Sequence, residues 1–272
     1  RDAGTDVRVL ALRRPIPPLS TLRHGGVGRW LAGMPGLLRP WQSDGLPVAA
    51  VPFLAPPRPW SYGVWGHWAA PSLAIALTRL WRRWPFDVVH AHSLVPTGFA
   101  AASWIRHARR LGVEPVPALV ASTHGADVIH IPYGSRPARR ATESVLRDAT
   151  IVVANSRWAA RRCEEIAGHP VESRVVHFGT ELPSPLPPRH ERATLVTVAH
   201  LQSRKHHAVV LHALAELVPR LRPDYVVIGD GPGRGPLASL AARLGLTGQV
   251  RFLGQLDHGD ALAECWRCHL YV

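Results

Sequence analysis

Short apolar runs rich in valine, isoleucine and leucine alternate with amphipathic segments over the first 185 residues. The runs show little polar alternation, which is typical of strands covered on both faces. They span 6–12, 46–53, 86–92, 117–123, 150–156 and 173–179. Helical periodicity falls between them, near 70–83, 97–111, 137–148 and 157–167. Strands and helices in regular succession predict right-handed crossovers and a mainly parallel sheet.

A proline-rich segment interrupts this alternation. Four prolines lie between positions 183 and 188, where neither a helix nor a central strand can continue. We therefore expect an extended linker over 183–192. The pattern then restarts, with strands over 193–200, 224–230 and 249–255, helices near 206–218, 234–245 and 259–267, and the start of another strand at 268–272. The prediction is an α/β protein with one domain over 1–182 and a second, incomplete domain over 193–272.

The chain is strongly basic, with a formal net charge of +13, which favours anionic partners. The charge is spread thinly, with arginine pairs near the ends of predicted helices as its densest pieces, and no basic tail or zinc-finger spacing occurs. We interpret it first as a solvated surface and second as a membrane-facing one, and we expect no nucleic-acid partner. Residues 1–14 are charged from the first position, so we expect no signal peptide and a cytoplasmic location.

Cysteine content indicates no disulfide framework and fits a reducing compartment. The chain has three cysteines, and Cys265 and Cys268 form a lone C-x-x-C pair on a predicted helix. No second pair completes a tetrahedral zinc site, so we interpret the spacing as incidental and expect no metal.

Residues 59–78 carry no charged side chain and match a bilayer span in length. Prolines and glycines within the segment argue against a continuous membrane helix. Two interpretations remain for Trp60, Trp65 and Trp68. They suit a loop at a lipid interface, which would be a peripheral contact at the inner face of the membrane. Packing onto the domain's own core is the interpretation we favour.

Lys205 is the only lysine in the chain. It follows a predicted strand and a short turn, at or just before the first turn of a helix, where backbone N–H groups and the helix dipole attract phosphate. Arg204 adjoins it and His200 precedes it. A phosphate site and a solvated helix start are both compatible with these residues.

Other polar residues also follow predicted strands, where parallel sheets bind ligands. The turn 229–235, GDGPGRG, fits neither the dinucleotide fingerprint nor the P-loop, but its glycines allow close approach of backbone to a ligand. His90, His92 and His124 stand at neighbouring strand ends and are candidates for substrate hydrogen bonds or for structural roles. Nucleophilic catalysis has little support because no G-x-S-x-G elbow occurs.

The ordered series of strand ends resembles the family-4 glycosyltransferases of the GT-B fold. The segments that carry the resemblance run from residue 86 to the end and include FDVVHAHSLVPTGFAAA, VASTHGADV, LVTVAHLQSRKHH, VIGDGPGRG and VRFLGQLDHGD. The resemblance implies two Rossmann-like domains and an enzyme that moves a sugar, with retention, from a nucleotide-diphosphate donor to a glycan or lipid-linked acceptor. The donor is a substrate, so no cofactor is implied.

The resemblance also assigns residues. Lys205 matches the lysine that neutralises the donor diphosphate, with Arg204 and His200 beside it; His200 stands where the family usually has arginine. His124 matches the histidine that reaches the donor sugar. The other matched positions are Gly231, Gln255, Leu256 and His258 on the donor and nucleotide side, and His92 and Asp127 on the acceptor side.

Two family features are missing. Residues 1–12 resemble the family's second strand rather than its first, and the E-x7-E segment would follow Val272. We therefore expect a chain truncated at both ends that is inactive by itself. The alternatives are a non-catalytic nucleotide-binding module and a membrane-associated scaffold.

Overall fold

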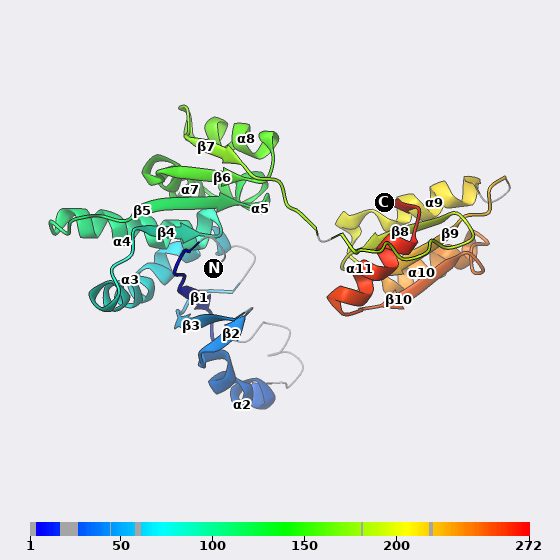
Figure 1. Ribbon diagram of the computed structural model, residues 1–272, viewed down its shortest axis with the longest axis horizontal. Helices are drawn as coiled ribbons and strands as arrows, with labels where there is room; N and C mark the ends of the chain where they lie inside the picture. The colour runs from blue at the N-terminus through cyan, green and yellow to red at the C-terminus, as the bar shows by residue number, and fades with distance from the viewer. Residues whose placement is uncertain (1–3, 17–26, 44, 58–60, 181, 218–219) are drawn as a thin grey trace. The chain divides into compact units, whose positions relative to one another are not determined.

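The computed structural model describes residues 4–16, 27–43, 45–57, 61–180, 182–217 and 220–272. The chain forms two compact units, Arg1–Phe178 and Gly179–Val272. Both are α/β, with parallel strands connected by helices (Figure 1). Each unit is described by itself below.

The larger sheet of the first unit has four parallel strands in the order β4-β5-β6-β7 (Figure 1). They span Val88–Ala91, Ala118–Thr123, Ile151–Ala154 and Ser173–Val175. The connections contain η2 (Leu94–Gly98), α4 (Phe99–Arg110), α5 (Ala126–Ile129), α6 (Ile131–Gly134), α7 (Arg136–Asp148) and α8 (Arg157–Ala167). Ser135 and Ser156 cap α7 and α8 by accepting hydrogen bonds from Ala138 N and Ala159 N. The predicted alternation is thus confirmed here.

The N-terminal strands form a separate sheet of three, in the order β1-β3-β2. Strand β1 (Val9–Arg13) is parallel to β3 (Leu46–Pro52), whereas β2 (Trp41–Ser43) is antiparallel to it. Neither β2 nor α2 (Val27–Leu38) was predicted, because three residues are too few to show a period and α2 contains Pro35. The sheet of the first unit is therefore mixed and divided, rather than one continuous parallel sheet.

A groove of about 880 Å³ lies between the two sheets. Its walls include Val9 and Leu10 of β1 and Val88 and Val89 of β4, and Leu77 of the helix α3 (Trp65–Arg83) lines it as well. Within the described residues, β1 and β4 each pair with a neighbour on one side only. The groove thus separates two strand edges with open hydrogen-bonding groups.

The tryptophan-rich segment is divided between core and surface. It contains η1 (Tyr62–Val64) and α3, which begins five residues before the predicted helix. Trp65 is buried, stacks edge-on with Phe53 and donates through Nε1 to Pro56 O at 3.0 Å. Trp68 is 51% exposed, and Trp60 lies outside the described residues. Packing onto the core therefore holds for Trp65 and fails for Trp68.

The second unit is a three-layer α/β/α domain. Its four strands are all parallel, in the order β10-β9-β8-β11, and span Val250–Gly254, Asp224–Ile228, Thr194–Val198 and Leu270–Tyr271. The helical elements are η3 (Ser203–Lys205), α9 (His207–Leu217), α10 (Arg234–Arg243) and α11 (His258–Arg267). Tyr225 and Val227 pack in one cluster with Leu211 of α9, and Val226 packs in another with Ala261 of α11. The predicted strand at 268–272 is present as β11.

None of the helices in the described parts of the chain combines the length and the apolar character that crossing a bilayer requires.

Candidate functional site

A pocket of about 310 Å³ opens at the carboxyl ends of β8, β9 and β10 in the second unit. Each strand contributes the residues that follow it. The lining includes His200 after β8, Gly229 and Asp230 after β9, and Gln255 and Leu256 after β10. This is the edge of a parallel sheet at which ligands bind. Three residues predicted for the donor side, His200, Gln255 and Leu256, are therefore brought together.

Two glycines let the loops after β8 and β9 pack against each other. Gly229 has φ +124°, and a Cβ atom added there would lie 2.1 Å from Ala199 O. Gly231 has φ +154°, and a Cβ atom there would lie 2.9 Å from His200 Cε1. Only glycine fits both the backbone angles and the space. The predicted Gly231 does not itself line the pocket, but the side chain of His200, which does, lies against its backbone.

Lys205 and Arg204 lie in η3, two to three residues before α9. Both are exposed, and Arg204 Nε donates to Gln202 Oε1 at 3.0 Å. Neither lines the 310 Å³ pocket. The predicted position of Lys205, in the turn before a helix, is what the structure shows.

A buried polar chain lies beneath this turn. Tyr225 OH is 2.7 Å from Thr197 Oγ1 and 3.3 Å from Nδ1 of His207, the first residue of α9. Burial, and secondarily the charge of Lys205, lowers the pKa of His207 below its ordinary value. Burial also raises the pKa of Tyr225. These hydrogen bonds were not predicted, because the three residues are far apart in the sequence and their polar groups could not be distinguished from surface ones.

His258 is the first residue of α11 and is exposed. It does not line the pocket, whereas Ala261 of the same helix does. Its predicted place beside a nucleotide base remains a proposal.

A ladder of stacked aromatic rings marks the carboxyl ends of β4 and β5 in the first unit. The ring centroids of His90 and His92 are 4.3 Å apart, those of His92 and His124 are 6.2 Å apart, and those of His124 and Phe178 are 5.8 Å apart. His90 Nε2 is 2.7 Å from Ser122 Oγ. The three histidines do converge, and Phe178, which the sequence did not indicate, extends the ladder.

Electrostatics in the ladder favour a neutral His90. Partial burial lowers the pKa of His90 below 6.5, and the neighbouring His92 and His124 lower it further. A neutral imidazole both donates and accepts hydrogen bonds, which suits contact with hydroxyl groups.

Asp127 is buried, with 3% of its surface exposed. Its Oδ1 accepts hydrogen bonds from His124 N and Thr123 Oγ1, both at 3.0 Å, and its Oδ2 accepts one from Leu94 N at 3.1 Å. These bonds join the loops that follow β4 and β5. The carboxylate thus faces its own domain and fixes the backbone of His124.

Comparison with protein families identifies both units. Residues 1–179 match the family described as glycosyl transferase 4-like domain, and residues 180–272 match glycosyl transferases group 1. The chain belongs to the glycosyltransferase 4-like family. Its two α/β units are those of the GT-B fold, as the sequence predicted.

Solved structures of glycosyltransferases are similar to this one in fold. HepE of Anabaena, solved with UDP and glucose, is 18% identical, with a TM-score of 0.60 over 98% of this chain and 73% of its own. Sucrose-phosphate synthase of Thermosynechococcus elongatus is 14% identical, with a TM-score of 0.62 over 85% of this chain and 60% of its own. A glycosyltransferase of Rickettsia africae is 16% identical, with a TM-score of 0.56 over 95% of this chain and 70% of its own. No curated protein matches this glycosyltransferase chain.

Proposed function

We propose that this glycosyltransferase binds a nucleotide-diphosphate sugar at the second unit and transfers the sugar, with retention, to a glycan or lipid-linked acceptor. The observation that carries the donor assignment is the pocket after β8, β9 and β10, where His200, Gln255 and Leu256 converge beside the glycine turn. Structures of HepE, which has a similar fold, hold UDP with glucose and UDP-glucose. Gln255, Leu256 and His258 are the residues that we assign to the nucleotide.

The chemical demand on the donor site is stabilisation of the leaving diphosphate. As the bond to the sugar breaks, negative charge grows on the diphosphate, and fixed positive groups lower the energy of that state. Lys205 supplies a compact ammonium, with Arg204 beside it and the N-terminus of α9 two residues on. His200 supplies a further hydrogen-bond donor to the diphosphate, at the position where the family usually has a permanently charged arginine. In this proposal the chain's own cations do the work, and the donor is a substrate rather than a cofactor.

On the acceptor side we assign the histidine ladder. His124 contacts the donor sugar near the reacting carbon, and His92 contacts the acceptor; both rings are exposed and lie next to each other in the middle of the ring stack. Asp127 holds the backbone of His124 and is a positioning residue.

The single lysine makes the donor proposal testable. Reductive methylation with ¹³C-formaldehyde labels only Lys205 and the terminal amine, and Lys205→Arg identifies the Lys205 resonance. We expect one of UDP, GDP or ADP to shift that resonance saturably. If one of them binds by calorimetry and leaves the resonance unmoved, the role of Lys205 is wrong. If none binds, the donor assignment is wrong. Sugar transfer by the protein that binds the nucleotide would exclude the alternative, a non-catalytic nucleotide-binding module.

We also propose a peripheral contact with anionic lipid at the cytoplasmic face of a membrane. Trp68 and Ile75 are 51% and 54% exposed and lie seven residues apart on α3, hence on one side of the helix. Exposed Arg79 and Arg82 continue that side, and α3 contains no acidic residue. A tryptophan and an isoleucine beside arginines suit the headgroup region of an anionic bilayer.

A further inference from the structure

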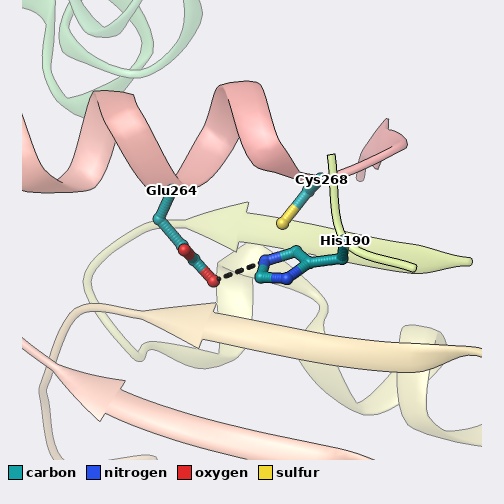
Figure 2. A group of neighbouring side chains, drawn as sticks. All are labelled: His190, Glu264 and Cys268. Carbon is teal, nitrogen blue, oxygen red and sulfur yellow. Dashed lines mark hydrogen bonds and ion pairs between the residues drawn. The ribbon is translucent and has the colours of Figure 1, made fainter. Parts of the chain in front are cut away.

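A second group of polar side chains lies in the second unit, and its residues do not line the donor pocket. His190 comes from the proline-rich segment before β8, and Glu264 and Cys268 come from α11 and the residue that follows it. The ligand atoms of all three lie within 4.8 Å of one another. In Figure 2 the three side chains point toward a common centre.

The backbone holds this group together. Glu264 lies in the last turns of α11 and Cys268 is the residue that ends the helix, four positions later, so the two side chains lie about one turn apart. The N–H of His190 donates to Arg267 O at 2.9 Å, which fixes the proline-rich segment against the end of α11. His190 Nε2 lies 3.0 Å from Glu264 Oε1 (Figure 2). Three chemically different side chains are therefore already held close together in the structure.

The surroundings are largely dry. The side chains of His190 and Glu264 are 19% and 15% exposed, and Cys268 is packed with Val196 and Ala261 in a core cluster. The thiol of Cys268 is buried beside an imidazole and a carboxylate. The one hydrogen bond between His190 and Glu264 leaves further lone pairs of these three groups free to bind a ligand.

We propose that His190, Glu264 and Cys268 bind one zinc-type transition-metal ion, with a water molecule as fourth ligand. Imidazole nitrogen, carboxylate oxygen and thiolate sulfur are the ligand types of protein zinc sites, and sulfur disfavours magnesium and calcium. On binding, the Cys268 thiol proton leaves to solvent and a sulfur–metal bond forms. Arg251 lies 3.5 Å from Glu264 Oε1 and opposes the added positive charge, so it weakens the site without blocking it.

The ion would act as a clip. It would tie residue 190 of the proline-rich segment to α11, the helix whose first residue is His258 and whose Ala261 lines the donor pocket. The role is structural and independent of the proposed sugar transfer.

Cobalt titration of the whole 272-residue chain tests the site, because Co²⁺ bound to a thiolate gives a sulfur-to-metal charge-transfer band. We expect one equivalent of Co²⁺ to produce that band and Zn²⁺ to displace it. Cys268→Ser should abolish the band and weaken Zn²⁺ binding by at least about 100-fold. Cys265→Ser is the matched control: Cys265 is three residues earlier, outside the group, and its loss should leave both unchanged.

Three results would overturn the proposal: no band at one equivalent, equal loss in the two cysteine variants, or loss in Cys265→Ser alone. Because Cys268 is buried and its variant can fail to fold, His190→Ala provides a second test. His190 lies outside the helices and strands, and this variant should keep its helical circular dichroism while losing Zn²⁺ affinity. A folded His190→Ala protein that binds Zn²⁺ as tightly as the parent would also refute the site.

Discussion

The carboxylate of Asp127 accepts a hydrogen bond from the backbone N–H of His124 at 3.0 Å, and both residues follow the same strand, β5. The other carboxylate oxygen accepts from Leu94 N, in the segment after β4. One buried side chain therefore fixes the position of the proposed sugar-contacting histidine relative to the neighbouring strand end.

Replacing Asp127 with asparagine should destabilise the first unit. The amide nitrogen would replace one acceptor oxygen and face a backbone or hydroxyl donor, leaving a buried hydrogen bond unmade. We expect a loss of about 2 kcal/mol in the free energy of unfolding, measured by urea denaturation. The exposed Asp87→Asn is the control and should change it by less than about 0.5 kcal/mol. Equal effects of the two substitutions would contradict the positioning role of Asp127.

Substitution of Gly229 with alanine should disrupt the donor pocket. The new methyl group would meet Ala199 O at 2.1 Å, and the backbone angle is unfavourable for any other residue. We expect the free energy of unfolding of the second unit, measured by urea denaturation, to fall by about 3 kcal/mol or more. Gly235→Ala offers a control of opposite sign, since nothing lies within 4 Å of its added methyl in α10. That variant should gain about 0.5 kcal/mol. Tolerance of alanine at Gly229 would show that the two loops do not pack as described.

Stability of the first unit should fall as the pH is lowered below 6.5. Burial and the neighbouring histidines lower the pKa of His90 in the folded state, so the unfolded chain takes up a proton first. The stabilisation is complete above pH 6.5 and is lost as the pH falls through the lowered, folded-state pKa. Because the ring is partly open to solvent, we expect the free energy of unfolding to fall by less than about 1 kcal/mol between pH 7.5 and pH 5.5.

His90→Gln should flatten this pH profile while retaining a hydrogen-bonding partner for Ser122. Urea denaturation at pH 7.5 and pH 5.5 measures how much the free energy of unfolding changes with pH in the parent and in the variant. A profile of the same slope in the variant would assign the pH dependence to other groups.

Binding to anionic vesicles should depend on the exposed side of α3. Removal of both apolar groups in Trp68→Ala/Ile75→Ala is expected to weaken co-sedimentation with phosphatidylglycerol vesicles by about 10-fold, since each buries apolar surface in the interface. Trp158→Ala is the matched control, because Trp158 is 48% exposed on a different helix, α8. Equal binding of parent protein to neutral and anionic vesicles would refute the proposed contact.

The sequence predicted the helices and strands that have a clear hydrophobic pattern. Long buried strands such as β5 and β9 show it clearly, and the glycines and histidines that follow strands predicted where functional groups gather. Strand β2 escaped notice because a three-residue edge strand has no measurable period. Phe178 was missed because an exposed aromatic residue near a domain boundary gives no local signal.

The cysteines show the limit of reading spacing alone. Cys265 and Cys268 drew attention as a C-x-x-C pair, but the residues grouped with Cys268 are Glu264, one helical turn earlier, and His190, 78 positions away. Contacts of that sequence separation depend on how the proline-rich segment crosses α11. For the same reason Asp127 was expected to face an acceptor: a carboxylate after a strand looks the same in sequence whether it is buried or exposed.

The divided sheet of the first unit has a consequence for handling the protein. Within the described residues, β1 and β4 each pair on one side only and border the apolar groove, in which Val88 is 51% exposed. Open strand edges of this kind pair with extended polypeptide, including that of a second copy of this protein. We therefore expect the protein to self-associate in concentrated solution. A charged residue at position 88 would act as a gatekeeper against it.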